Sequence, residues 1–93
     1  MRKELLKHKE AKEILRELSS GRRLRKHWNY EVNGRLHWEN DPKNDPRLKG
    51  DAIALLYRNG FIENSRDDQF EVKIGVMGKH LIDRYPDLIN DYR

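Results

Sequence analysis

The sequence contains no cysteine, and apolar residues make up only 35% of its 93 positions. Without cysteine the chain has neither disulfide bonds nor thiolate metal ligands, a composition typical of a reducing cytosol. Long hydrophobic runs are also missing, so no segment has the length of a membrane span. The charged first residues lack the apolar centre of a secretory signal peptide. We therefore expect a cytoplasmic protein without a membrane partner.

The scarcity of large apolar residues bounds the fold. A chain of 93 residues forms one domain, here residues 1–93, and folding buries roughly 60–65% of the surface of a chain this short. Charged residues make up 39% of the chain and aromatic residues 9%. The tryptophans and the periodic apolar segments favour a folded domain over disorder.

Positive charge is concentrated at the start of the chain. The net charge is +4, and residues 1–27 contain ten Lys or Arg against four Glu. Residues 28–93 contain ten Lys or Arg against twelve Asp or Glu. A basic segment of this kind is typical of proteins that contact polyanions.

Apolar residues recur at spacings of three and four near the start and predict an amphipathic helix over residues 2–18. Gly21, after two serines, is a plausible helix stop. A stripe of this kind also allows homodimer formation through the same residues. The stripe consists of Leu5, Ala11, Ile14, Leu15 and Leu18.

An aromatic hairpin is predicted over residues 24–40, LRKHWNYEVNGRLHWEN, around the turn signal Asn33-Gly34. A two-residue turn would place the two tryptophans on opposite faces. A three-residue loop with a bulge at Gly34 places Trp28 opposite Trp38, and it brings an opposite-charge pair together beside the turn. We prefer this second register because it gathers the aromatic rings on one face.

That aromatic face has two interpretations. Tyr30 and Leu36 join the tryptophans on it in the preferred register. The face is either part of the core or an exposed platform for stacking. We expect core, because so few other large apolar residues are available.

Later segments carry strong local signals. Asp45-Pro46 is an N-cap followed by a first-turn proline, and it opens a helix that reaches Asn59 and that Gly50 can split. Strands are predicted over 61–64 and 70–74, joined by a loop over 65–69. A last helix is predicted over 78–85, and we expect its inward residues to be Leu81, Ile82 and Tyr85.

Residues 52–85, AIALLYRNGFIENSRDDQFEVKIGVMGKHLIDRY, resemble the C-terminal half of winged-helix domains. In that family an apolar helix is followed by a glycine, an apolar strand pair called the wing, and a helix that starts near a Gly-Lys pair. Upstream, a hairpin and a connector replace the first helix of a helix-turn-helix, and only residues 41–49 can supply a reduced version. The resemblance implies a small α+β, winged-helix-like domain with an additional aromatic β-hairpin after the first helix.

The resemblance and the basic segment together predict a nonenzymatic, regulatory nucleic-acid-binding protein, with duplex DNA as the expected partner. Closely spaced guanidinium groups suit phosphate oxygens, and phosphate neutralisation supplies most nonspecific affinity. The same run can equally be a strand edge that is protected by charge. The predicted phosphate contacts are Arg22, Arg23, Arg25, Lys26, Lys43, Arg47, Lys49 and Arg58.

Catalysis is not expected, and neither is a cofactor or a bound metal. The preferred register places His27, Asn29, His37 and Glu39 on one face, a combination that can bind Zn²⁺. The arrangement resembles that of the His-Asn-His nucleases, but their metal-ligating helical histidine has no counterpart over residues 46–59.

A protein-interaction module is the alternative to nucleic-acid binding. Winged-helix domains often serve as docking surfaces. Small, highly charged proteins without cysteine are frequent in phages and mobile elements, where they inhibit or redirect a host protein complex. Acidic residues at Asp67-Asp68 and near the end of the chain suit a polar partner surface.

Overall fold

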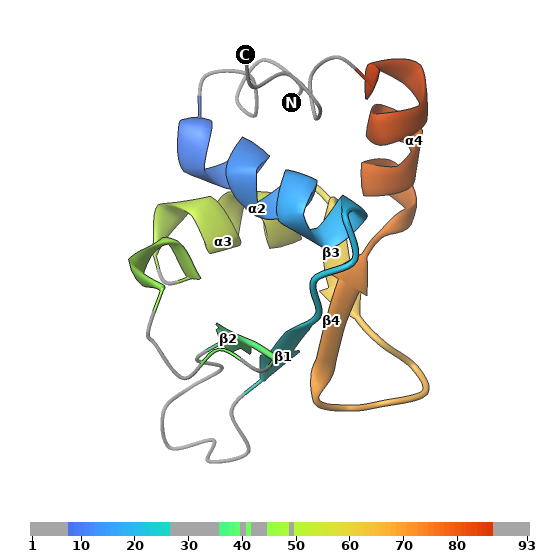
Figure 1. Cartoon of the computed structure of the whole chain (residues 1–93). Coiled ribbons are helices and arrows are strands. Elements are labelled where there is room, and N and C mark those ends of the chain that lie inside the picture. The colour runs from blue at the N-terminus through green and yellow to red at the C-terminus, as the bar shows by residue number, and fades with distance from the viewer. Residues whose placement is uncertain (1–7, 27–35, 40, 42–44, 49, 87–93) are drawn as a thin grey trace.

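The computed structural model describes residues 8–26, 36–39, 41, 45–48 and 50–86. Within these ranges the chain is a small α+β domain, in agreement with the predicted fold class and compatible with a winged-helix-like arrangement (Figure 1). None of the helices in these ranges is long and apolar enough to cross a membrane. The elements are α2 (Lys9–Ser19), β1 (Leu24–Lys26), β2 (Leu36–Trp38), the 3-10 helix η2 (Pro46–Leu48), α3 (Asp51–Arg58), β3 (Ile62–Asn64), β4 (Glu71–Ile74) and α4 (Val76–Arg84).

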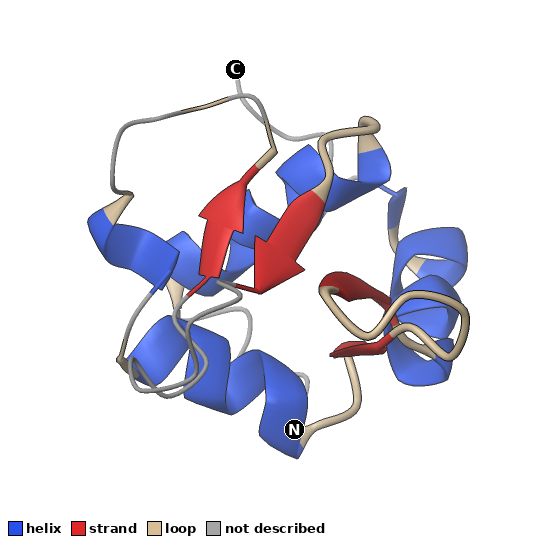
Figure 2. Ribbon diagram, turned by 90° about the horizontal axis from the view of Figure 1, so that it is seen from below, coloured by secondary structure: helices blue, strands red, loops and turns tan. Residues whose placement is uncertain are grey.

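The four strands form one antiparallel sheet in the order β2-β1-β4-β3. The sheet is strongly twisted (Figure 2). Leu24 lies opposite both Trp38 of β2 and Val72 of β4, so an apolar row crosses three strands. All three side chains are at most 1% exposed. This row joins the β1–β2 pair to the β3–β4 pair, which lies where the sequence predicted two strands.

The predicted register of the aromatic hairpin is wrong. Trp38 lies opposite Leu24 instead of Trp28, and Leu36 lies opposite Lys26. The pairing is shifted by an even number of residues, so the inward face of β2 is kept. Burial of Leu24 against Trp38 explains the shift, because it extends the apolar row into β4. Residues 27–35, with the predicted turn, lie outside the described residues, but the expectation that Trp38 belongs to the core is confirmed.

Helix α2 covers the core through the predicted stripe. Ala11, Ile14 and Leu15 are completely buried, and α2 packs against α3, η2 and β4. The helix ends where predicted: Ser20 is its C-cap, and Gly21 follows with a φ of +109°. Ala11, Ile14 and Leu15 face the chain's own core, and the homodimer that the sequence allowed stays a prediction. Residues 1–7 lie outside the described ranges.

Local signals place α3 correctly. The backbone N–H of Arg47 donates to the Asp45 carboxylate over 3.0 Å, as expected of an N-cap. Gly50, with a φ of +88°, separates η2 from α3, and Gly60, with a φ of +74°, follows its end. The chain then turns directly into β3. The predicted helix from Asp45 to Asn59 is therefore split at Gly50.

Helix α4 is held against the turn between α3 and β3. The N–H of Gly75 donates to the carbonyl of Phe61 over 2.9 Å. A Cβ at Gly78 would collide with the same carbonyl oxygen, so only glycine permits this approach. The helix consequently begins at Val76, before the predicted start at residue 78. Leu81 points inward as predicted, but Tyr85 does not, because it is 37% exposed at the rim of α4.

The burial of Trp38 makes a direct stability prediction. We expect Trp38→Ala to lower the free energy of unfolding by about 3–5 kcal/mol, since it empties a large volume in a small core. Trp38→Phe keeps most of the packing but removes the indole N–H. Its free energy of unfolding should therefore fall by less, about 1–2 kcal/mol. Urea denaturation of the three proteins measures both values. If Trp38→Ala unfolds at the same urea concentration as the parent, the ring is not part of the core.

Candidate functional site

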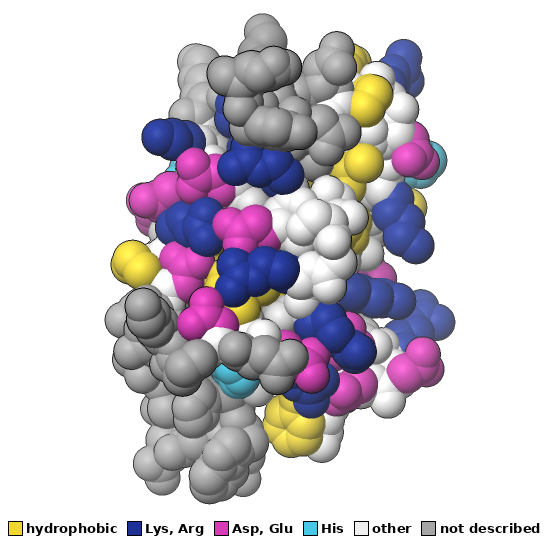
Figure 3. Space-filling view, viewed as in Figure 1, with side chains coloured by type: hydrophobic (Ala, Val, Ile, Leu, Met, Phe, Trp, Pro, Cys, Tyr) yellow, Lys and Arg dark blue, Asp and Glu magenta, His cyan; other side chains and the backbone are white. Residues whose placement is uncertain are grey.

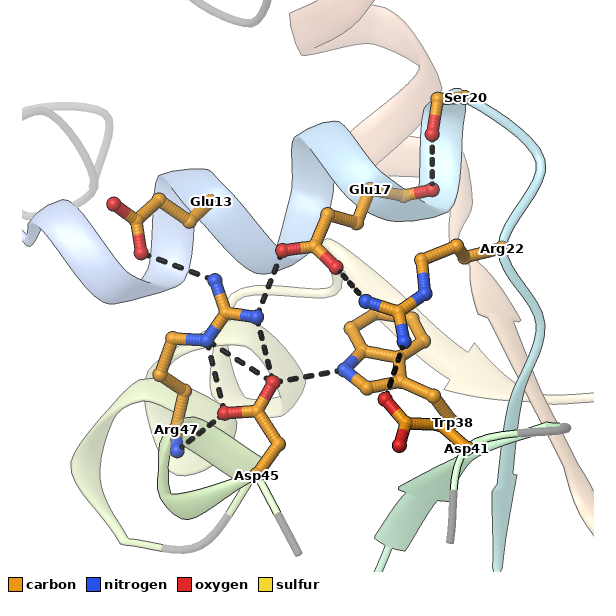
Figure 4. A network of polar contacts seen from close by, with 8 residues as sticks. All are labelled: Glu13, Glu17, Ser20, Arg22, Trp38, Asp41, Asp45 and Arg47. Carbon is orange, nitrogen blue, oxygen red and sulfur yellow. Dashed lines mark hydrogen bonds and ion pairs between the residues drawn. The ribbon is translucent and has the colours of Figure 1, made fainter. Parts of the chain in front are cut away.

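Arg22, the first predicted phosphate contact, lies within a network of polar side chains (Figure 4). Its guanidinium group forms ion pairs with Glu17 and, over 2.9 Å, with Asp41. The same group lies 4.4 Å from the centre of the Trp38 ring, in cation–π geometry. Arg22 therefore links the end of α2 to β2 and to the connector that follows it.

The next two arginines are also paired. Arg23 lies 3.2 Å from Glu39 and 3.3 Å from Glu71, so it bridges the segments on either side of β1. Arg25 lies 3.0 Å from Asp68, which belongs to the loop between β3 and β4. That contact ties the wing-like loop to the centre of the sheet. The three arginines of the run are thus paired with carboxylates from four parts of the chain.

Arg47 is the most connected side chain of the network. It lies 2.6 Å from Asp45, 2.8 Å from Glu17 and 3.1 Å from Glu13. These partners belong to α2 and to the start of η2, so one guanidinium group joins both helices. Its side chain is only 22% exposed. At this exposure the ion pairs are screened less by solvent than pairs on an open surface.

Asp45 completes the network on the side of the sheet. The indole N–H of Trp38 donates to its carboxylate over 2.9 Å, while Arg47 donates to both oxygens. The hydrogen bonds from Arg47 hold the pKa of Asp45 far below its ordinary value of 3.8, although partial burial acts in the opposite direction. Asp45 thus caps η2, anchors Arg47 and satisfies the buried indole N–H.

The eight predicted phosphate contacts are therefore not equivalent. Arg22, Arg23, Arg25 and Arg47 have carboxylate partners, and a phosphate group would have to compete with them. Lys26 and Arg58 form no ion pair with any described residue. Lys43 and Lys49 lie outside the described residues. The sequence could not reveal the pairs of Arg25 with Asp68, of Arg23 with Glu71 and of Arg47 with Glu13, because these carboxylates come from distant segments.

The residues of the metal alternative are only partly described. His37 is half-buried in β2 and Glu39 follows that strand, while His27 and Asn29 lie outside the described residues. In the part of the chain that the structure covers, no group of three or more His, Asp or Glu side chains could hold a metal ion.

A different surface, which the sequence analysis missed, lies on α4. Among the described residues the exposed large apolar side chains are Val76, Met77 and Tyr85, with exposed fractions of 62%, 48% and 37%. Figure 3 shows apolar side chains at the surface near α4, whereas basic and acidic side chains alternate around α2. Met77, Leu81 and Tyr85 are spaced by four residues and therefore lie on one face of the helix. Because the predicted helix began at residue 78, the sequence did not show that Met77 belongs to this face.

That face borders a groove of about 280 Å³, which the structure places between α4 and the start of β3. The floor is apolar, and Phe61 and Leu81 are 2% and 4% exposed. The lining residues are Phe61, Met77, His80, Leu81, Arg84 and Tyr85.

No family model, curated protein or solved structure matches the chain. Two features of the described residues bear on function: the polar network around Arg47 and the exposed apolar face of α4.

The lowered pKa of Asp45 has a consequence for stability. A carboxyl group whose pKa is lower in the folded than in the unfolded state stabilises the fold above its ordinary pKa of 3.8, and this contribution disappears as the pH falls below that value. We expect Asp45→Asn to lower the free energy of unfolding by about 1–3 kcal/mol near neutral pH. The difference from the parent should shrink progressively below about pH 4.

Denaturant titrations across this pH range measure the difference, with Asp67→Asn in the exposed β3–β4 loop as the matched control. The control should follow the parent at every pH. A difference for Asp45→Asn that stays constant down to about pH 2 would contradict the ion pair with Arg47.

Proposed function

We propose that the chain is a nonenzymatic interaction module that binds a protein partner through the exposed face of α4. This was the second of the two functions that the sequence suggested. The observation that carries it is the exposure of Met77 and Tyr85, which line an apolar groove.

Exposure of these side chains is costly in so small a domain. Each Å² of apolar surface that is removed from water contributes roughly 25 cal/mol. A partner that covers these side chains therefore adds a favourable free energy to the complex. Contiguous apolar side chains at a surface mark interaction sites more often than isolated ones do. Methionine also adapts its shape to different partners, which suits Met77 at the edge of the groove.

The polar network supports the same proposal because it disfavours the alternative, binding of a polyanion. A phosphate group that bound Arg22 or Arg47 would displace carboxylates, and Asp45 would lose the charge partner that lies 2.6 Å away. Breaking such a partly buried pair leaves an uncompensated charge. The network is therefore better suited to hold α2, η2 and β2 together than to bind a polyanion.

Nucleic-acid binding remains the second candidate because of the arrangement that follows β2. There η2 and α3 are joined at Gly50 and lead into the β3–β4 hairpin, in the order that resembles a winged-helix domain. Lys26 and Arg58 are the described cations from the predicted set that form no ion pair with a described residue. Asp67 and Asp68 in the β3–β4 loop oppose phosphate at that position.

A salt titration separates the two candidates. The affinity for a 20-base-pair duplex is measured at several salt concentrations for the parent and for the double variant Arg22→Ala, Arg23→Ala. If both arginines contact phosphate, the slope of log K against log salt becomes shallower by about 1.8. We expect an unchanged slope together with a lower melting temperature, because these side chains hold the fold together.

The matched control is the double variant Lys26→Ala, Arg58→Ala. Under the second candidate this variant, and not the arginine pair, makes the slope shallower by about 1.8. Tight duplex binding that disappears with Arg22 and Arg23, in a variant that stays fully folded, would overturn the proposal that α4 is the binding surface.

A further inference from the structure

The groove beside α4 is smaller than most small-molecule sites. Its volume of about 280 Å³ falls below the range of roughly 300–1,000 Å³ that is usual for ligand pockets. Its apolar floor consists of Phe61 and Leu81, while Met77 and Tyr85 form half-exposed walls. A cavity of this size and shape accommodates apolar side chains of a protein segment better than it encloses a separate ligand.

The one permanently charged side chain in the lining of the groove is the guanidinium group of Arg84. Arg84 and His80 line it, and no acidic residue does. Arg84 forms no ion pair with any described residue, in contrast to Arg22 and Arg47, which are held by carboxylates. A guanidinium group at the edge of an apolar groove is best complemented by a carboxylate on the occupant.

A second copy of the chain fits this groove less well. In a twofold dimer the same surface meets itself, so Arg84 of one copy would lie near Arg84 of the other. Like charges facing each other oppose association. Asp83 is the acidic residue of α4, but it does not line the groove and lies on another face of the helix.

We infer that the groove takes an amphipathic segment of a partner protein, with apolar side chains on Phe61 and Leu81 and an Asp or Glu on Arg84. This inference rests on the proposed function and adds the chemistry of the partner. It corresponds to the common mode in which a helix or an extended segment inserts alternate apolar anchors into a groove.

The probe is a phage-displayed library of random dodecapeptides, selected against the full chain. Enriched sequences are synthesised, and their affinities are measured for the parent, Met77→Glu, Arg84→Glu and Arg66→Glu. Arg66 is an exposed cation of the β3–β4 loop and provides the matched control. Circular dichroism melting verifies that each variant is folded, as expected for substitutions at exposed positions.

We expect enriched peptides to combine apolar residues with Asp or Glu. Their affinity should fall more than about tenfold for Met77→Glu, which places a carboxylate beside the apolar floor. For Arg84→Glu we expect a loss of about three- to tenfold, because an attractive charge pair becomes a repulsive one. Arg66→Glu should bind like the parent.

Other outcomes separate the two levels of the proposal. Basic or neutral peptides that depend on Met77 but not on Arg84 would overturn the acidic partner while leaving α4 as the docking surface. If no peptide is enriched, or if Met77→Glu binds enriched peptides like the parent, both proposals fail. If the parent is a dimer in sedimentation equilibrium and Met77→Glu is a monomer, the occupant of the groove is a second copy of the chain. That result would overturn the acidic segment.

Discussion

The ion pair between Arg47 and Asp45 is the contact on which the arrangement of the other elements depends. Arg47 also forms ion pairs with Glu13 and Glu17 of α2. Asp45 accepts a hydrogen bond from the indole N–H of Trp38 in β2. A single hydrogen-bonded cluster thus fixes the first helix, the hairpin strand and the start of the α3 segment against one another. In a domain with so small an apolar core, this cluster adds specificity that packing alone provides less well.

The same use of charge shapes the surface. Arg22, Arg23 and Arg25 of the basic segment form ion pairs with carboxylates of the chain, so their positive charge is partly balanced within the fold. The surface of α4 differs in kind: Val76, Met77 and Tyr85 expose apolar area there, and Arg84 forms no ion pair with any described residue. The fold thus uses three arginines of this segment in internal ion pairs, while Arg84 lies beside an apolar groove at the surface.

Local sequence signals predicted the elements well where one residue type determines the backbone. The cap at Asp45, the break at Gly50 and the stop at Gly60 lie where the sequence placed them, and β3 and β4 match their predicted ranges within one residue. The hairpin register failed because Leu24, at the edge of the segment, forms an apolar row with Val72, which lies far away in the sequence.

The candidate site was harder to predict because its determinants are long-range. The partners of Arg22, Arg23, Arg25 and Arg47 lie in α2, the connector, β4 and the β3–β4 loop, and no spacing rule connects these segments. The exposed face of α4 depends on Gly78, whose missing Cβ allows the helix to approach Phe61. The predicted helix began at residue 78, so the sequence analysis did not place Met77 on this face.

The most direct test is the side-chain NMR signal of the Arg47 guanidinium N–H. The Nε–H of Arg47 donates to Asp45 over 2.9 Å, so its signal should be resolved near neutral pH and exchange slowly with water. It should also stay in place when a DNA duplex is added at low salt. Rapid exchange, with a shift of the Arg47 signal on addition of the duplex, would show that this arginine is an open phosphate contact.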